Sequence, residues 1–390
     1  MAYFDWNATT PLLSKAREAW LNASDARWGN PSTPYRLGAQ AKLLLEVSRE
    51  SVAGLMGVEP TQVVFTSGAT ESNNGFLREA ARKFPQGEIW ISAIEHPSVR
   101  EAAHRFWGEE RARQMPVLPD GLLDLDWMVA RLEKDRPAMI SLMAANNETG
   151  VLQPFRQVAE LCRSRGIEFH CDAVQWPGKD PEPFSGWGTL SGVTLSAHKF
   201  GGPKGTGCMI LGPDWQGTQW QVGGSQELGS RAGTEDLAGI DAMAVALEDR
   251  MGRSEATGQA GARDRFESEL TRIWPEVVIH GRKAPRIGNT SSVSLPVFNA
   301  LRWISRLDRH GFQVSTGAAC SAGKKGSSVV LRAMGVDEAT ARRTIRISAG
   351  WETTESDWQE LLAALVEVRA ELEESGTPGE GPGKVINIGD

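Results

Sequence analysis

The sequence predicts an α/β protein, with a large domain built on a mainly parallel sheet between helices and a smaller α+β domain after it. Two observations support this prediction. Short apolar segments alternate with longer amphipathic ones up to about residue 250, a pattern typical of parallel strands joined by helices. Polar and glycine-rich motifs directly follow several of the short segments, and open α/β sheets bind ligands at such strand ends.

The elements of the large domain, residues 13–250, follow from turn signals and periodicity. Gly57 and Gly166 end two helical patterns, because glycine tolerates the left-handed backbone that closes a helix. The expected helices are 14–22, with Ser14 as a candidate N-cap, 36–56, 69 to about 83, 125–134 and 156–165. The expected strands are 62–66, 88–92, 139–143, 168–171, 192–195 and 207–211.

A second unit begins where this pattern loosens, in a helical stretch rich in Gly, Ser and Glu at 247–261. We expect residues 1–12 and 251–374 to form the small domain. Residues 375–390 begin with a Gly/Pro-rich run and are expected to be a flexible tail. The expected segments of the small domain are 277–280, 291–295, a helix at 300–309, 312–315, 329–334, 344–348 and a helix at 356–372.

Composition and charge argue against several classes of function. The chain has 42 Lys and Arg against 49 Asp and Glu, a formal net charge of −7, so nothing favours nucleic acid or an anionic membrane as a partner. No apolar run is long enough for a membrane span and the start shows no signal peptide, so a cytoplasmic location is the default. The four cysteines have no metal-ligand spacing, and Cys162, Cys171 and Cys208 lie in apolar patterns and are expected in the core.

Lys199 lies between a predicted strand and a Gly-Gly-Pro turn, in residues 196–205 (SAHKFGGPKG). A lysine at a strand end can be desolvated, which lowers the pKa of its amine and makes it nucleophilic toward aldehydes. Ser196 and His198 flank it with groups that can bind an anion. Taken alone, a solvated surface lysine is the commoner interpretation, so other motifs must decide between the two.

Two further motifs follow strands. Residues 67–71 (SGATE) lead into a helix whose free N–H groups can bind a phosphate, with the Thr70 hydroxyl beside them; the alternative is an ordinary N-cap at Ser67 or Thr70. Asp172 ends a strand, where its carboxylate can hold a protonated ring nitrogen; the alternatives are a helix N-cap or a paired core carboxylate. An anion cradle, an Asp and a Lys at strand ends together predict pyridoxal 5'-phosphate, because the Lys binds it covalently and the Asp keeps its ring nitrogen charged.

A series of motifs extends this reading over nearly the whole chain, from residue 3 to about 355. They are 3–11 (YFDWNATTP), 29–32 (GNPS), 65–74 (FTSGATESNN), 95–99 (EHPSV), 146–150 (NNETG), 170–175 (HCDAVQ), 196–205, 231–235 (RAGTE), 315–320 (STGAAC), 330–335 (VLRAMG) and 345–350 (IRISAG). Taken together, the chain resembles the cysteine desulfurases, which are class V aminotransferase-like enzymes of the fold-type I pyridoxal-phosphate group.

The resemblance implies a role for each matching residue. Lys199 would form the Schiff base with the cofactor, Asp172 would bind its pyridinium, and His96 would stack on its ring, with a core histidine that fixes the turn before Pro97 as the alternative. Thr234 would reach the phosphate of a neighbouring subunit, which implies a homodimer with shared sites. The other implied contacts are the ring hydroxyl with Gln175, the phosphate end of the cofactor with Ala69, Thr70, Ser196 and His198, and the substrate carboxylate with Asn147 and Arg346.

Cys320 would be the cysteine that receives sulfur. It lies in a stretch of small residues, expected to be mobile, and the positive charges of Lys324 and Lys325 would favour its thiolate; a free loop cysteine without a role is the alternative. The implied activity is that of an L-cysteine desulfurase, which releases L-alanine and leaves a persulfide on Cys320. The persulfide sulfur would pass to an iron–sulfur scaffold protein or another thiolation pathway.

Other functions stay open at this point. The fold also suits a selenocysteine lyase or an aminotransferase, and a sulfur-relay protein without catalysis is an alternative from another class. The sequence departs from the family pattern at Thr33-Pro34-Tyr35, where a histidine is common, in the basic loop after Cys320, and in the tail. These departures leave the sulfur acceptor undecided.

Overall fold

The computed structural model describes residues 2–179, 186–251, 256–316 and 328–375. Cys320 and, apart from Ser375, the predicted tail lie outside these residues. In the described part, no helix has both the length and the apolar character that a membrane crossing requires.

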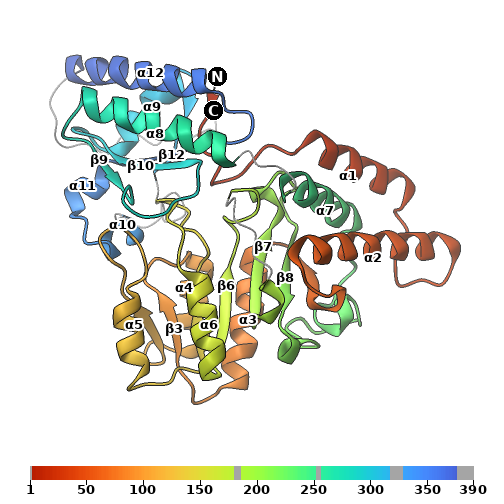
Figure 1. The fold of residues 1–390 in the computed structure, drawn as a ribbon. Coiled ribbons are helices and arrows are strands. Elements are labelled where there is room, and N and C mark those ends of the chain that lie inside the picture. Colours follow the sequence, from red (N-terminus) through yellow and green to blue (C-terminus); the bar gives the residue numbers. More distant parts are fainter. Residues whose placement is uncertain (1, 180–185, 252–255, 317–327, 376–390) are drawn as a thin grey trace.

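A seven-stranded sheet forms the centre of the larger part of the molecule (Figure 1). Its strands in spatial order are β2 (Val63–Thr66), β8 (Gly207–Leu211), β7 (Gly192–Ser196), β6 (Glu168–Asp172), β5 (Met139–Ser141), β3 (Ile89–Ser92) and β4 (Ala112–Met115). Every neighbouring pair is parallel except the two that involve β8. The prediction of a mainly parallel sheet is therefore confirmed.

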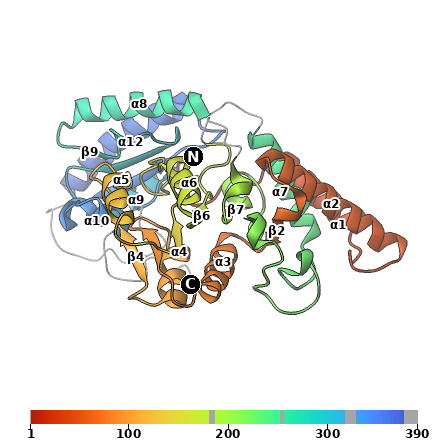
Figure 2. The ribbon, with the colours of Figure 1, turned by 60° about the horizontal axis from the view of Figure 1, so that its bottom comes forward.

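Helices cover both faces of this sheet, because its strands are apolar on both sides. The helices are α1 (Ser14–Ala26), α2 (Arg36–Met56), α3 (Ala69–Lys83), α4 (Pro97–Trp107), α5 (Leu125–Leu132), α6 (Phe155–Arg165) and α7 (Leu237–Met251). Val63 and Phe65 of β2 belong to one hydrophobic cluster with α2, α5, α6 and α7, whereas Val64 belongs to another with α3 and α4. Figure 2 shows α1, α2 and α7 extending together on one side.

A smaller unit lies at one end of the molecule, around α8, α9 and α12 (Figure 1). Its strands are β9 (Val278–His280), β10 (Thr290–Ser294) and β12 (Thr344–Ser348), which form an antiparallel sheet, and β1 (Ala2–Tyr3) and β11 (Phe312–Gln313), which form a parallel pair. Its helices are α8 (Ala256–Ile273), α9 (Ala300–Arg309), α10 (Val329–Ala333), α11 (Glu338–Arg342) and α12 (Glu355–Glu374). Phe4 packs in the same hydrophobic cluster as residues from 262 to 372. This separate cluster supports our proposed division into domains at residues 12 and 250.

Several local predictions differ from the structure, and helices α4, α11 and most of α7 were not among the expected elements. Strand β4 was not expected, because it is a half-buried edge strand with the mixed sequence ARQM and shows no clean periodicity. Helix α8 continues to Ile273 although its first half is rich in Gly and polar residues, because Phe266 and Leu270 pack in the core and tertiary contacts override propensity. Ser14 does not cap α1; Leu13 is the N-cap residue and makes no side-chain cap.

Candidate active site

A cavity of about 520 Å³ lies where β6 and β7 end and α3 begins. The N-terminal segment and Arg346 of β12 close its other side. The predicted site residues that line it are Ala69, Thr70, His96, Asn147, Asp172, Gln175, Ser196, His198, Lys199 and Arg346. Thr234 lines a neighbouring hollow that shares Ser67 and Gly205 with the cavity. A volume of this size accommodates a small organic ligand.

Lys199 ends a short 3-10 helix, Ala197–Lys199, that directly follows β7. Its Nζ donates hydrogen bonds to the backbone oxygens of Asn7 and Ala8, each at 2.7 Å. The turn after it requires Gly201, which has φ of 92° and whose added Cβ would lie 2.5 Å from Leu13 Cγ. The backbone therefore holds the Lys199 amine against the N-terminal segment, at the wall of the cavity.

Asp172 ends β6 and is 6% exposed. Its Oδ1 accepts the Val174 N–H at 3.1 Å and its Oδ2 accepts Asn73 Nδ2 at 3.0 Å. Burial, with the charge of Asp172 as a second cause, raises the pKa of the neighbouring Glu95 carboxyl well above its ordinary value. Asp172 is thus the carboxylate with two hydrogen-bond donors, whereas burial disfavours the ionised form of Glu95.

Asn73 links Asp172 to His96 and was not singled out from the sequence. Besides Asp172, its Nδ2 donates to Ser98 Oγ at 2.9 Å, and its Oδ1 accepts the Thr194 hydroxyl at 2.7 Å. Ser98 Oγ lies 2.8 Å from His96 Nδ1. Asn73 lies inside the motif 65–74, but these contacts join residues on different elements, so no local sequence signal announced them.

The start of α3 is the segment that the sequence predicts to bind an anion. Gly68, with φ of 141°, is the N-cap residue, and no side chain caps this helix, so the predicted alternative of a cap by Ser67 or Thr70 is wrong. Glu71 accepts the Ser67 N–H at 2.8 Å and pairs with Arg231 at 2.9 Å. Burial opposes ionisation, but the hydrogen bonds from Arg231 and Ser67 lower the pKa of Glu71.

His198 and His96 face the cavity with depressed basicity. Burial, followed by the charge of Lys199, lowers the pKa of His198 to about 4, and its Nδ1 lies 3.1 Å from Thr9 Oγ1. Burial is also the main cause that lowers the pKa of His96, although Asp172 acts in the opposite direction. Near neutral pH both imidazoles are therefore uncharged, able to stack or to donate one hydrogen bond.

Gln175 and a second lysine, Lys179, meet at Asn7. Gln175 Nε2 donates to the Asn7 backbone oxygen at 2.9 Å, and Gln175 Oε1 accepts a hydrogen bond from Lys179 Nζ. Lys179 Nζ also donates to Asn7 Oδ1 at 3.1 Å. Burial and then the charge of Lys199 lower the pKa of Lys179 well below its ordinary value. Sequence analysis missed Lys179, because a lysine in a turn gives no sign that it folds inward.

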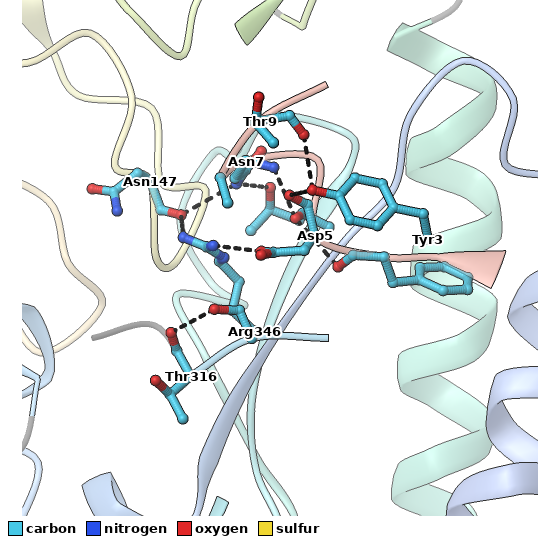
Figure 3. Close-up of polar contacts among 12 residues, drawn as sticks. Tyr3, Asp5, Asn7, Thr9, Asn147, Thr316 and Arg346 are labelled. Carbon is cyan, nitrogen blue, oxygen red and sulfur yellow. Dashed lines mark hydrogen bonds and ion pairs between the residues drawn. The ribbon is translucent and has the colours of Figure 1, made fainter. Parts of the chain in front are cut away.

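Arg346 lies on β12 with its side chain 4% exposed (Figure 3). Its Nη1 donates to the backbone oxygen of Asn147 at 3.0 Å, and its Nη2 donates to Asp5 Oδ1 at 2.6 Å. Asn147 makes this contact through its backbone, and its side chain points away from the guanidinium. Sequence analysis did not single out Asp5, because no local sequence pattern connects it with Arg346, 341 positions away.

The three described cysteines are buried in the core, as predicted. Burial raises the pKa of the Cys162 and Cys208 thiols to about 12, and it raises that of Cys171 well above its ordinary value. None of the three is a nucleophile at neutral pH, because the thiolate is the reactive form. No group of three His, Cys, Asp or Glu among the residues that the structure covers is arranged to hold a metal ion.

Comparison with known proteins gives the family. The family model described as aminotransferase class-V matches residues 2–361. A cysteine desulfurase of Cereibacter sphaeroides is 37% identical, covering 93% of this chain and 94% of that protein. The cysteine desulfurase NifS of Azotobacter vinelandii is 33% identical, covering 98% of each. A solved NifS-like protein superposes with a TM-score of 0.86 at 31% identity, covering 95% of this chain and 99% of the other. The chain belongs to the class-V aminotransferase family and, within it, to the cysteine desulfurases.

Proposed function

We propose that the protein is a pyridoxal-phosphate-dependent L-cysteine desulfurase. The observation that carries the proposal is one cavity that presents a lysine amine, a donor-supplied carboxylate and a buried guanidinium. The family relationship supports the same activity. Selenocysteine lyase and aminotransferase activities remain outcomes of the test below rather than separate proposals.

The residues present fit pyridoxal phosphate. Lys199 would hold it covalently, Asp172 would bind its ring nitrogen, and the uncapped start of α3 would bind its phosphate together with Ser196 and His198. Neutral His96 would stack on its ring, and Gln175 would contact its ring hydroxyl. When bound, this cofactor supplies an electron sink that stabilises negative charge on the amino-acid carbon next to the amino group.

The chain's own residues would then transfer one proton and bind one carboxylate. Lys199 would take the proton from that carbon and later return it. While its amine carries the proton, the backbone oxygens of Asn7 and Ala8 would accept hydrogen bonds from it. Arg346 would bind the substrate carboxylate, and Asn147, whose backbone oxygen accepts from Arg346, would help to place it. The arrangement orients L-cysteine with its α-carbon toward Lys199.

Cys320 is the residue of this chain that we propose receives the sulfur from L-cysteine. Its thiolate would attack Sγ of L-cysteine, so that a sulfur–sulfur bond forms as the substrate carbon–sulfur bond breaks. The electron pair of the broken bond would stay with the β-carbon, which then takes up a proton, and L-alanine leaves. Cys320 lies outside the described residues, but the other three cysteines are buried thiols with raised pKa values, which supports the assignment by elimination. An iron–sulfur scaffold or another thiol would then accept the sulfur, and we keep the cytoplasm as the proposed location.

A homodimer with shared sites is also proposed. Glu227 lines the same hollow as Thr234 and pairs at 2.9 Å with Arg49 of α2. On the same helix, Leu43 and Val47 are exposed one turn apart. Exposed apolar side chains on a helix that also reaches the hollow of Thr234 are what a second copy could cover.

The test is exposure of the purified protein to L-cysteine without reductant, followed by alanine assay and mass spectrometry. We expect alanine and one added sulfur on Cys320, and Cys320→Ser should lose both products while L-cysteine still alters the cofactor spectrum. Dependence on a keto acid would indicate an aminotransferase. Turnover of selenocysteine by Cys320→Ser, without cysteine turnover by the wild type, would indicate a selenocysteine lyase.

A further inference from the structure

The guanidinium of Arg346 is paired with groups of the chain itself (Figure 3). Asp5 Oδ1 accepts Nη2 at 2.6 Å, and the Asn147 backbone oxygen accepts Nη1 at 3.0 Å. Nε is buried and has no hydrogen-bond partner among the residues that the structure describes. Arg346 lines the cavity, whereas Asp5 does not, so the carboxylate of Asp5 approaches the guanidinium from outside the cavity.

Asp5 is fixed in this position by the N-terminal segment. The Tyr3 hydroxyl lies 3.0 Å from the backbone oxygens of both Asp5 and Thr9, which share its one proton as acceptors. A backbone bridge joins Asp5 to Ser348, two residues beyond Arg346 on β12. The backbone of the ion pair is therefore held on both sides.

The other carboxyl near Arg346 belongs to Glu148. Burial raises the pKa of Glu148, although the charge of Arg346 acts against this, and its Oε2 accepts the Ser328 hydroxyl. Among the described residues, the ion pair of Arg346 is with Asp5 alone. Asp5 is thus the counter-ion that the described part of the chain supplies to this guanidinium.

We infer that Asp5 is a positioning residue that orients Arg346 and weakens its hold on the carboxylate of the amino acid. This inference rests on the proposed function for the choice of ligand. A second carboxylate on Arg346 is attracted by the guanidinium and repelled by Asp5 behind it. The balance lets the site bind L-cysteine and still release L-alanine, which carries the same carboxylate.

Removal of the charge, with the hydrogen-bond acceptor kept, should therefore tighten binding. In Asp5→Asn the amide oxygen can still accept from Nη2, but the ligand carboxylate becomes the only counter-ion of a buried guanidinium. An uncompensated buried charge destabilises the free protein, and the bound carboxylate relieves it. A purely structural role for Asp5 predicts the opposite sign, because a disordered Arg346 binds more weakly.

The experiment measures L-alanine binding to the purified wild-type protein and to Asp5→Asn by calorimetry, each with its cofactor. We expect the Kd for L-alanine to fall about tenfold in the variant, equivalent to about 1.4 kcal/mol. KM for L-cysteine should fall with it while kcat does not rise. L-Alanine should also raise the thermal midpoint of Asp5→Asn more than that of the wild type. If Asp5→Asn does not fold, Asp5→Ser takes its place.

Glu267→Gln is the matched control. Glu267 pairs with Arg286 at 2.7 Å within the same smaller unit, and both side chains are buried, but neither lines the cavity. This variant should lose stability without a change in the Kd for L-alanine. Equal tightening in Glu267→Gln would reveal a general effect and overturn the inference.

Three results would reject the role of Asp5. They are an unchanged or higher Kd in the Asp5 variant, unaltered L-alanine affinity in Arg346→Gln, and no measurable L-alanine binding to either protein. A different outcome would reject only the proposed function. In that case the wild type binds L-alanine through Arg346 and Asp5→Asn binds it more tightly, but the wild type makes no alanine from L-cysteine.

Discussion

The two walls of the cavity are built in different ways. On the sheet wall, Asp172 and Lys199 follow adjacent parallel strands, so the topology brings them together at one edge. On the opposite wall, Asp5 meets Arg346 across 341 positions of sequence, through the N-terminal segment and β12. The sheet wall carries the proposed chemistry and the opposite wall the proposed recognition of the carboxylate, so the two can be perturbed separately.

The walls also differ in electrostatics. Behind the sheet wall lies a network of neutral groups, in which Asn73, Thr194 and Ser98 satisfy one another and the Asp172 carboxylate. The opposite wall instead balances one full charge against another, at Arg346 and Asp5. Substitutions in the first should alter kcat, and substitutions in the second should alter ligand affinity.

The largest effect is expected for Lys199→Ala, on the sheet wall. Loss of a general base costs about 10²–10⁴-fold in rate, and this variant would also lose the covalent hold on the cofactor. Alanine formation from L-cysteine measures the loss, and borohydride reduction followed by peptide mapping locates the cofactor on the wild type. Lys204, which also lines the cavity, is the control; an adduct on Lys204 would show that Lys199 was assigned wrongly.

Asp172→Asn should follow, with about a 100-fold loss of kcat and little change in KM. The amide cannot stabilise a ring cation, and each ~1.4 kcal/mol lost from the transition state costs tenfold in rate. Circular dichroism should show a folded protein, because the amide can keep one of the two hydrogen bonds that Asp172 accepts. Near-normal alanine formation by the folded variant would remove Asp172 from the mechanism.

How much was predictable follows the same division between walls. The alternation of short strands and longer helices predicted the parallel sheet, and motifs at strand ends predicted Thr70, Asp172, and Lys199 with its flanking residues, because strand ends and turns are encoded locally. The other predicted residues that line the cavity came from the family resemblance. Asp5, Asn73 and Lys179 were not identified, since their partners lie on other elements and only the tertiary fold brings them together. Cys320 rests on the motif alone, because it lies outside the described residues.

Asn73→Ala should have a smaller effect, about tenfold on kcat. The variant leaves Asp172 with one donor fewer and releases Ser98 from one of its contacts, so both Asp172 and His96 are less well oriented. Loss of buried hydrogen bonds should also cost about 1–3 kcal/mol of stability. A double-mutant cycle with Asp172→Asn measures the coupling, and additive losses would show that Asn73 acts independently of Asp172.

Substitution of two buried histidines, one in each unit, should have the smallest effect on activity. These histidines should instead make the stability of the protein depend on pH. Burial lowers the pKa of His170, on β6, to about 3 and that of His280, on β9, to about 4. Because both values lie below the unfolded value near 6.5, the unfolded chain binds more protons as the pH falls below 6.5, and stability falls with it. Above about pH 6.5 the two histidines cost no stability. At pH 5 the loss of stability reaches about 2 kcal/mol for each histidine, as an upper bound.

Urea unfolding at pH 7 and pH 5 measures this loss, and matched variants separate the two units. His170→Gln should remove the share of the pH dependence that His170 contributes in the central sheet, and His280→Gln the share that His280 contributes in the smaller unit. If the units unfold in separate steps, each variant should flatten only one of them. If unfolding is a single transition, both variants should reduce the same pH dependence by similar amounts. Stability that does not fall between pH 7 and pH 5 would contradict the burial of both imidazoles in neutral form.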